Sequence, residues 1–239
     1  MSSPRQKKGH TLYGTIVFCI AGVCLQLLYL LIYPTGDVCR WLEYALVLVC
    51  LGYSLYAHSL DVEGCLCVTA LAFTAAADFF LVALREVQLI PGLSMFLAAQ
   101  LCWAGRLLYL EEGKRRLTHL AVWACAAGTL AVVAIIIARG ADLLLLLGAC
   151  YFSLLVTTAL FAWLTPKNLL FALGMTLFVG CDLFVMANNA GTYMDLADAP
   201  FFKAMSTVPF NMEWLCYGPS QMLLALSARG GMDLEPMEA

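Results

Sequence analysis

Residues 168–188 read NLLFALGMTLFVGCDLFVMAN, an apolar stretch in which Asp182 is the only charged residue. A helix that crosses a lipid bilayer needs about 20 mainly apolar residues, so this stretch predicts a transmembrane helix. Residues 65–84, CLCVTALAFTAAADFFLVAL, repeat the pattern with Asp78 as their only charge. A carboxylate in the middle of a membrane is costly unless it is paired, hydrated or protonated. Such residues usually mark a transport pathway or a reaction centre.

The composition of the whole chain agrees with these two stretches. Hydrophobic residues make up 63% of it and charged residues 12%, whereas soluble domains are about half apolar and a quarter charged. We therefore predict an all-α, polytopic transmembrane bundle of about eight helices. Its single transmembrane domain covers residues 12–228, between a short N-terminal segment (1–11) and a tail (229–239). The predicted spans are 12–32, 40–58, 65–84, 89–110, 118–138, 142–164, 168–188 and 208–228.

The distribution of basic residues predicts the orientation of the chain. Eight lysines and arginines fall on the side of the two termini and four on the other, which favours cytoplasmic termini. Arg106 lies within the fourth span, near its cytoplasmic end, where its side chain could snorkel to the surface. We expect an integral multi-pass protein, in the plasma membrane of a bacterium or the endoplasmic reticulum of a eukaryote.

The two aspartate stretches are also similar to each other. In each, two small residues precede the aspartate and an apolar residue and Phe follow it, and the next predicted helix carries one glutamine, Gln100 or Gln221. A duplicated four-helix unit would explain this, as in some transporters. Convergence on small residues that pack helices closely is the alternative.

The two aspartates and several other polar residues are predicted to lie at similar depths in the membrane. Asp78 and Asp182 lie 13 and 14 residues from the start of their predicted spans, about 20 Å from the cytoplasmic end at about 1.5 Å per residue. Glu213 and Tyr217 are four apart, so they share one helix face. They fall in the same half of the membrane or near its middle, together with Gln26, Tyr29, Glu43 and Gln100. Ser220 or Gln221 is the next position on the stripe of Glu213 and Tyr217.

Each of these residues also has a simpler reading. Glu43 is near enough to the predicted membrane edge to be solvated there. Gln26 is placed to make a hydrogen bond between helices, and Tyr29 to sit among interfacial aromatic residues. The two aspartates could be structural acids, buried in neutral form. We favour a site because intramembrane acids are expensive.

Metal catalysis is disfavoured by the sequence. A zinc site needs three or four ligands, and the histidines His10, His58 and His119 all map to cytoplasmic ends of spans, away from the aspartates. We expect neither a metal nor another cofactor. Of two neighbouring buried carboxyls, one can keep its proton while the other is ionised. Such a pair suits acid–base chemistry through an oxocarbenium-like cation.

At these residues the chain resembles the lysoplasmalogenase (YhhN-like) family of integral membrane ether hydrolases. The resemblance rests on four segments: ADFFL (77–81), PGLSMFLAAQ (91–100), FALGMTLFVGCD (171–182) and YGPSQMLLA (217–225). The chain departs from the usual residues of the family at Ala77, at Gln100 with Trp103, and at Cys181.

The resemblance implies hydrolysis of the vinyl ether bond of a lysoplasmalogen, giving a fatty aldehyde and a glycerophospho-choline or -ethanolamine. Asp78 and Asp182 fall on the two aspartates presumed to be the family's catalytic pair. Gln100, Tyr217 and Gln221 would position the lipid or the water, with Glu213 and Gln26 as further substrate-binding residues. The expected partners are a lysophospholipid substrate and membrane lipid, without nucleic acid.

Two other functions are compatible with the same residues. Buried acids also load and release protons in proton-coupled carriers, and the possible duplication is typical of transporters. A non-catalytic lipid-binding protein would use the same polar groups to hold a lipid intact.

Overall fold

The computed structural model describes residues 4–33, 36–57, 61–110, 113–138, 142–164, 168–193, 200, 203–204 and 211–228. Within these residues the chain forms eight long α-helices and no strand. A five-residue π-helical turn, η1 (Phe79–Ala83), follows the third helix directly. The helices are α1 (Pro4–Ile32), α2 (Gly36–Ala57), α3 (Val62–Asp78), α4 (Leu89–Leu110), α5 (Lys114–Ala138), α6 (Leu143–Leu164), α7 (Leu169–Tyr193) and α9 (Met212–Ser227).

The predicted polytopic all-α fold is confirmed. Seven segments, one in each helix from α1 to α7, are long and apolar enough to cross a membrane. The segment in the third helix includes η1. Helix α9 has 16 residues and is about 24 Å long, shorter than the others. The protein is therefore a multi-pass membrane protein in its architecture.

The predicted spans differ from the full helices at several ends. The membrane-crossing part of the first helix is Leu12–Ile32, as predicted, but α1 itself begins at Pro4. α2 begins at Gly36, and its membrane-crossing part at Asp37 rather than at residue 40. Hydropathy detects only the part of a helix that lipid surrounds, whereas backbone hydrogen bonds continue into polar residues. The third helix differs in another way, because its regular α-helical part ends at Asp78, and the predicted span 65–84 finishes as η1. The predicted tail, 229–239, lies outside the described residues.

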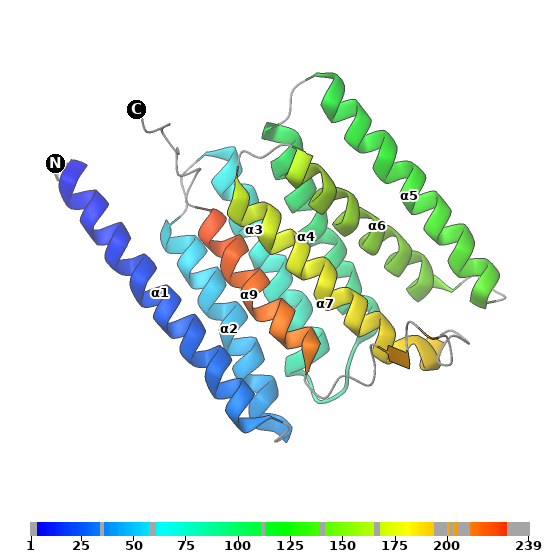
Figure 1. Ribbon diagram of the computed structural model, residues 1–239, viewed down its shortest axis with the longest axis horizontal. Coiled ribbons are helices and arrows are strands. Elements are labelled where there is room, and N and C mark those ends of the chain that lie inside the picture. The colour runs from blue at the N-terminus through cyan, green and yellow to red at the C-terminus, as the bar shows by residue number, and fades with distance from the viewer. Residues whose placement is uncertain are drawn as a thin grey trace.

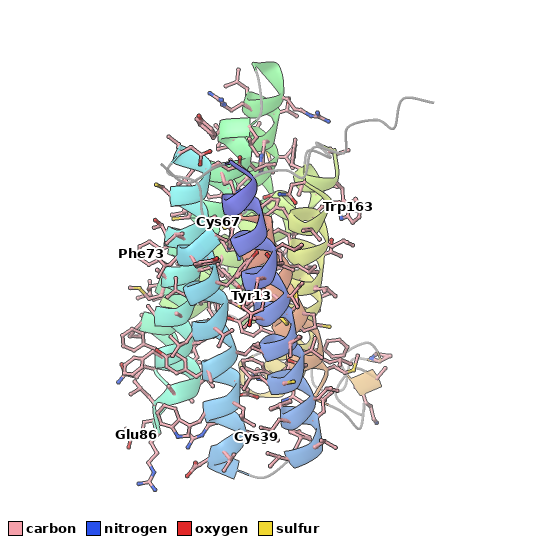
Figure 2. All side chains as sticks on the ribbon, turned by 90° about the vertical axis from the view of Figure 1, so that its left-hand side faces the viewer. Tyr13, Cys39, Cys67, Phe73, Glu86 and Trp163 are labelled. Carbon is pink, nitrogen blue, oxygen red and sulfur yellow. The ribbon has the colours of Figure 1, made fainter. Side chains whose placement is uncertain are left out.

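The helices lie side by side, with their long axes roughly aligned (Figure 1). α1 and α5 lie at opposite edges, whereas α9, the last helix, lies between α2 and α7. α9 also packs against α1 and α3, so the C-terminal part of the chain contacts the N-terminal helices. Figure 2 shows Cys39 and Glu86 toward one end of the bundle and Cys67 and Trp163 toward the other.

A buried ion pair ties four helices together near the end of the bundle that holds Cys67. The guanidinium of Arg106 on α4 donates to Glu63 on α3, at 3.1 Å from Nε and 2.6 Å from Nη2. It also donates to the hydroxyl and the carbonyl of Ser227, both at 2.7 Å. Asn168, just before α7, donates to the same carbonyl at 3.2 Å. Arg106 is only 1% exposed, so the expectation that it snorkels to the surface is wrong.

Candidate functional site

Asp78 occupies the junction at which α3 passes into η1. The backbone hydrogen bond from Leu84 to the carbonyl of Phe79 closes the wider π-helical turn. Such turns occur frequently at functional sites. The Asp78 side chain is 2% exposed, and its Oδ2 accepts a hydrogen bond of 2.6 Å from the hydroxyl of Tyr217 on α9. A buried carboxyl group thus links α3 to α9 within a membrane-spanning helix.

The Tyr217 ring is held by aromatic side chains on three helices. The rings of Phe96, Phe178 and Trp214 approach it edge-on, with centroid distances of 6.4, 5.5 and 4.9 Å. Edge-to-face contacts at such distances are favourable and directional. They fix the ring, and with it the hydroxyl that donates to Asp78.

Asp182 on α7 lies beside a second tyrosine. Its side chain is half-buried, and the phenol of Tyr151 on α6 stands next to it as a hydrogen-bonding group. The Asp182 Oδ2 is shielded from solvent and has no hydrogen-bond partner among the described residues. One oxygen of this carboxyl group is therefore available for a ligand.

Phe96 separates the two halves of this arrangement. Its ring lies 5.8 Å from Tyr151 and 6.4 Å from Tyr217. Within the described part of the chain, each aspartate interacts with its own tyrosine, and no hydrogen bond joins the two carboxyl groups. The aspartates thus belong to one aromatic-lined cluster in the bundle interior without forming a directly bonded pair.

Glu43 extends this cluster, contrary to the expectation that it is solvated. Its side chain is 8% exposed, and it lies within electrostatic reach of Asp78 and Glu213. Tyr29, expected among interfacial aromatics, is buried beside Glu43 and accepts a 2.7 Å hydrogen bond from Asn211. Glu43 was misplaced because α2 begins earlier than predicted, which puts this residue two turns inside the helix.

Two of the predicted substrate-binding residues connect helices in the structure. Glu213 is half-buried and accepts a 2.7 Å hydrogen bond from Asn188, which joins α9 to the end of α7. Gln26 donates to the carbonyl of Trp214 at 3.0 Å and packs against Gly218, which joins α1 to α9. For Gln26 this is the interhelical role that its sequence position left open.

Two further predicted positions, Gln100 and Gln221, are fully buried. Neither amide group has a hydrogen-bond partner in the part of the chain that the structure describes. Gln221 lies one turn after Tyr217 on α9. Pro219, between them, has no backbone N–H, so the carbonyl of Leu215 cannot make its usual helical hydrogen bond.

Sequence reasoning missed Tyr151. It occurs in an almost wholly apolar helix, where a lone tyrosine is easily taken for an ordinary packing residue. A signal was nevertheless present, because Thr158 follows seven residues later on the same face of α6, and both are buried.

The described residues contain no group of three or more His, Cys, Asp or Glu side chains arranged to hold a metal ion. His119 stacks on Phe161 with ring centroids 4.2 Å apart, between α5 and α6. This histidine therefore belongs to a helix–helix contact rather than to the aspartate cluster.

The sequence profile of the YhhN family matches residues 39–228. The chain belongs to the YhhN family. The matched region includes both aspartates and both tyrosines that lie beside them, and it begins within α2, after α1. The chain matches neither a curated protein nor a solved structure. Membership of the YhhN family fits a hydrolase of the lysoplasmalogenase type.

Proposed function

We propose that this YhhN protein is a membrane-embedded hydrolase that cleaves the vinyl ether bond of lysoplasmalogens. Its products would be a fatty aldehyde and glycerophosphocholine or glycerophosphoethanolamine. The observation that carries the proposal is the aspartate cluster, in which two intramembrane carboxyl groups each lie beside a tyrosine hydroxyl. Structural acids alone would not account for the unpartnered, shielded oxygen of Asp182.

The chemistry needs one proton donor and one proton acceptor. A protonated carboxyl group gives its proton to the β-carbon of the vinyl ether, and the double-bond electrons form the new C–H bond. The α-carbon becomes an oxocarbenium ion, which the second, ionised carboxylate stabilises. Water then adds to this carbon and loses its proton to that carboxylate. In the collapse of the hemiacetal, the second carboxyl group gives its proton to the ether oxygen, the C–O bond breaks, and the hydroxyl proton returns to the first carboxylate. Aldehyde and alcohol form, both carboxyl groups regain their starting states, and one water molecule is consumed.

The distribution of polar residues suggests how a lipid would lie. Glu43, Asn188, Asn211 and Glu213 continue from the aspartates toward the end of the bundle where α7 ends and α9 begins. A polar head group would lie among these residues. The single alkenyl chain would lie between the helices, and the ether bond would reach Asp78 and Asp182.

The proposal is tested with purified protein in detergent or nanodiscs and a 1-alkenyl lysophospholipid. Asp78→Asn and Asp182→Asn should each lower the rate of aldehyde release by at least about 100-fold, the lower range of general acid–base catalysis. Asp142→Asn is the matched control. Asp142 is exposed at the start of α6, where asparagine caps a helix equally well. Unchanged rates in both test variants would refute the mechanism.

The same preparation separates the two alternative functions. A proton-coupled carrier would take up solute in proteoliposomes under a pH gradient and release no aldehyde. A lipid-binding protein would return the bound lysophospholipid intact. The 1-acyl lysophospholipid should not be cleaved by the proposed enzyme, because an ester has no carbon–carbon double bond beside its oxygen to accept the proton.

A further inference from the structure

Gln100 on α4 and Gln221 on α9 present an unusual concentration of unsatisfied polar groups. Both side chains are 0% exposed, and all four of their amide nitrogen and oxygen atoms lack a partner within the described ranges. A buried polar group without a hydrogen bond destabilises the folded protein. Two such amides therefore imply a ligand that both donates and accepts hydrogen bonds.

Two contacts show that these glutamines lie at the same height. α4 and α9 touch through the rings of Phe96 and Tyr217, and again through Arg106 and Ser227. Both helices advance by ten residues between the two contacts, so they run in the same direction. Gln100 is four residues after Phe96, and Gln221 is four residues after Tyr217. The two amides thus occupy matching positions, one turn beyond the ring contact.

Further unpartnered groups occur beyond this level. The Trp103 Nε1 on α4 and the Thr158 hydroxyl on α6 are both buried and lack a partner in the described chain. They follow Phe96 and Tyr151, whose rings are in contact, by seven residues each. Trp103 and Thr158 therefore lie at about the same height as each other. This height is about one turn further along α4 than that of Gln100.

The Arg106 ion pair closes the end of the bundle beyond these groups. Its guanidinium lies 5.0 Å from the centre of the Phe171 ring and bonds to Glu63 and Ser227. Leu71, Met175 and Leu224 are fully buried in the same core. In the opposite direction, one turn separates Gln221 from Tyr217 and its bond to Asp78. The two amides therefore lie between the aspartate cluster and the Arg106 ion pair. We call the side of the cluster that faces this ion pair its inner side.

We infer that Gln100 and Gln221 form a hydration site that holds water at the inner side of the aspartate cluster. An internal water needs about two to four polar partners, and the two amides offer four groups. A lipid would come from the opposite side, where Glu43 and Glu213 lie. The glutamines are then positioning residues that keep the hydrolytic water within reach of the carboxyl groups. This last role rests on the proposed function, whereas the hydration site does not.

Radiolytic hydroxyl-radical labelling of the full-length protein in nanodiscs tests the site directly. Radicals formed from bound internal water oxidise side chains that bulk solvent cannot reach. We expect oxidation of Trp103, which is 0% exposed, and no oxidation of Cys50, which is equally buried on α2. In the double variant Gln100→Leu/Gln221→Leu, labelling of Trp103 should fall at least about fivefold. Trp103 as unreactive as Cys50 in the unchanged protein would overturn the inference, whether or not the variant folds.

Kinetics test the supply of water to the reaction. The double variant should lower kcat for lysoplasmalogen about tenfold or more and change KM less than twofold, because the lipid is held elsewhere. Gln88→Leu, an exposed change between η1 and α4, is the control. A raised KM with unchanged kcat would overturn the water-positioning role and assign the amides to the lipid. Labelled Trp103 in a protein that releases no aldehyde would refute the proposed function but leave the hydration site intact.

Discussion

Among the individual residues of the cluster, the Tyr217 hydroxyl offers the cleanest single-atom test. It donates a 2.6 Å hydrogen bond to Asp78, while its ring is fixed by neighbours that do not need the hydroxyl. A hydrogen bond to a charged group is worth about 1.5–3 kcal/mol. Tyr217→Phe should therefore reduce aldehyde release about 10- to 100-fold and leave the protein folded.

The control for this change is Tyr53→Phe. The Tyr53 hydroxyl is also paired with another helix, at 2.9 Å from Thr15, but it lies outside the aspartate cluster. It should leave aldehyde release within twofold of the parent protein. If the two phenylalanine variants were equally active, the Tyr217 hydroxyl that donates to Asp78 would have no part in the reaction.

The sequence revealed the acids of the site better than their neighbours, for a physical reason. Asp78 and Asp182 stand out because a charge inside an apolar span is costly, so each has to be explained. Tyr151 and Tyr29 are amphipathic, and such residues occur both in the interior and at the membrane interface. Their place depends on which face of a helix is buried, and this is set by packing between helices far apart in sequence.

At the scale of helices, the contact between α7 and α9 depends on Gly174. The hydroxyl of Ser220 reaches the carbonyl of Gly174 at 2.8 Å. A Cβ atom added at Gly174 would lie 2.9 Å from Leu224 Cγ and 3.3 Å from Leu223 Cβ. Leu224 is fully buried and has little room to move. Gly174→Ala should therefore lower the midpoint of thermal unfolding, although alanine is the better helix former by about 1 kcal/mol.

Gly52→Ala is the matched control for that prediction. Position 52 has no atom within 4 Å of an added Cβ, so only the gain in helix propensity remains. It should leave the unfolding midpoint unchanged or raise it. Equal midpoints for the two alanine variants would mean that α7 and α9 can separate at no cost.

The ion pair of Arg106 is a second contact that joins helices. Arg106→Gln would leave Glu63 and the Ser227 carbonyl without their main donor. Breaking a buried ion pair by removing one partner costs about 3–5 kcal/mol. Unfolding in detergent should show a loss of this size, whereas the exposed change Arg85→Gln should have almost no effect. A loss below about 1 kcal/mol would mean that solvent reaches the pair.

Helix number followed from hydropathy, but helix ends and the π-turn did not. A spanning stretch is recognised by its length and apolar content, which is why all seven long spans were predicted. The end of regular α-helix at Asp78 depends on hydrogen-bond geometry instead. Gln88 donates to the carbonyl of Phe80 in the segment that leads into α4, and no pattern in residues 79–88 indicates this bond.

At the scale of the whole molecule, the proposed duplication gains a structural counterpart but stays a prediction. In the sequence comparison, Gln100 corresponds to Gln221, so Phe96 corresponds to Tyr217. These corresponding rings are in contact, and the helices that carry them run in the same direction, as parallel repeats require. The two aspartates differ in their surroundings, since only Asp78 is followed by a π-turn. Two halves that began alike would thus now serve one site with two dissimilar acids.

The orientation of the bundle decides which leaflet the cluster faces. The excess of basic residues on one side predicts that Gly113, between α4 and α5, lies in the cytoplasm with both termini. Glu86, between η1 and α4, should then lie on the far side, at the end of the bundle that also holds Cys39 (Figure 2).

Epitope tags at Gly113 and at either terminus should become accessible to antibody once the plasma membrane alone is permeabilised. A tag at Glu86 should need permeabilisation of the membrane that holds the protein, or, in a bacterium, should be reached from outside. The reverse pattern would turn the head-group end of the cluster toward the cytoplasm, so that lysoplasmalogen would enter from the cytoplasmic leaflet.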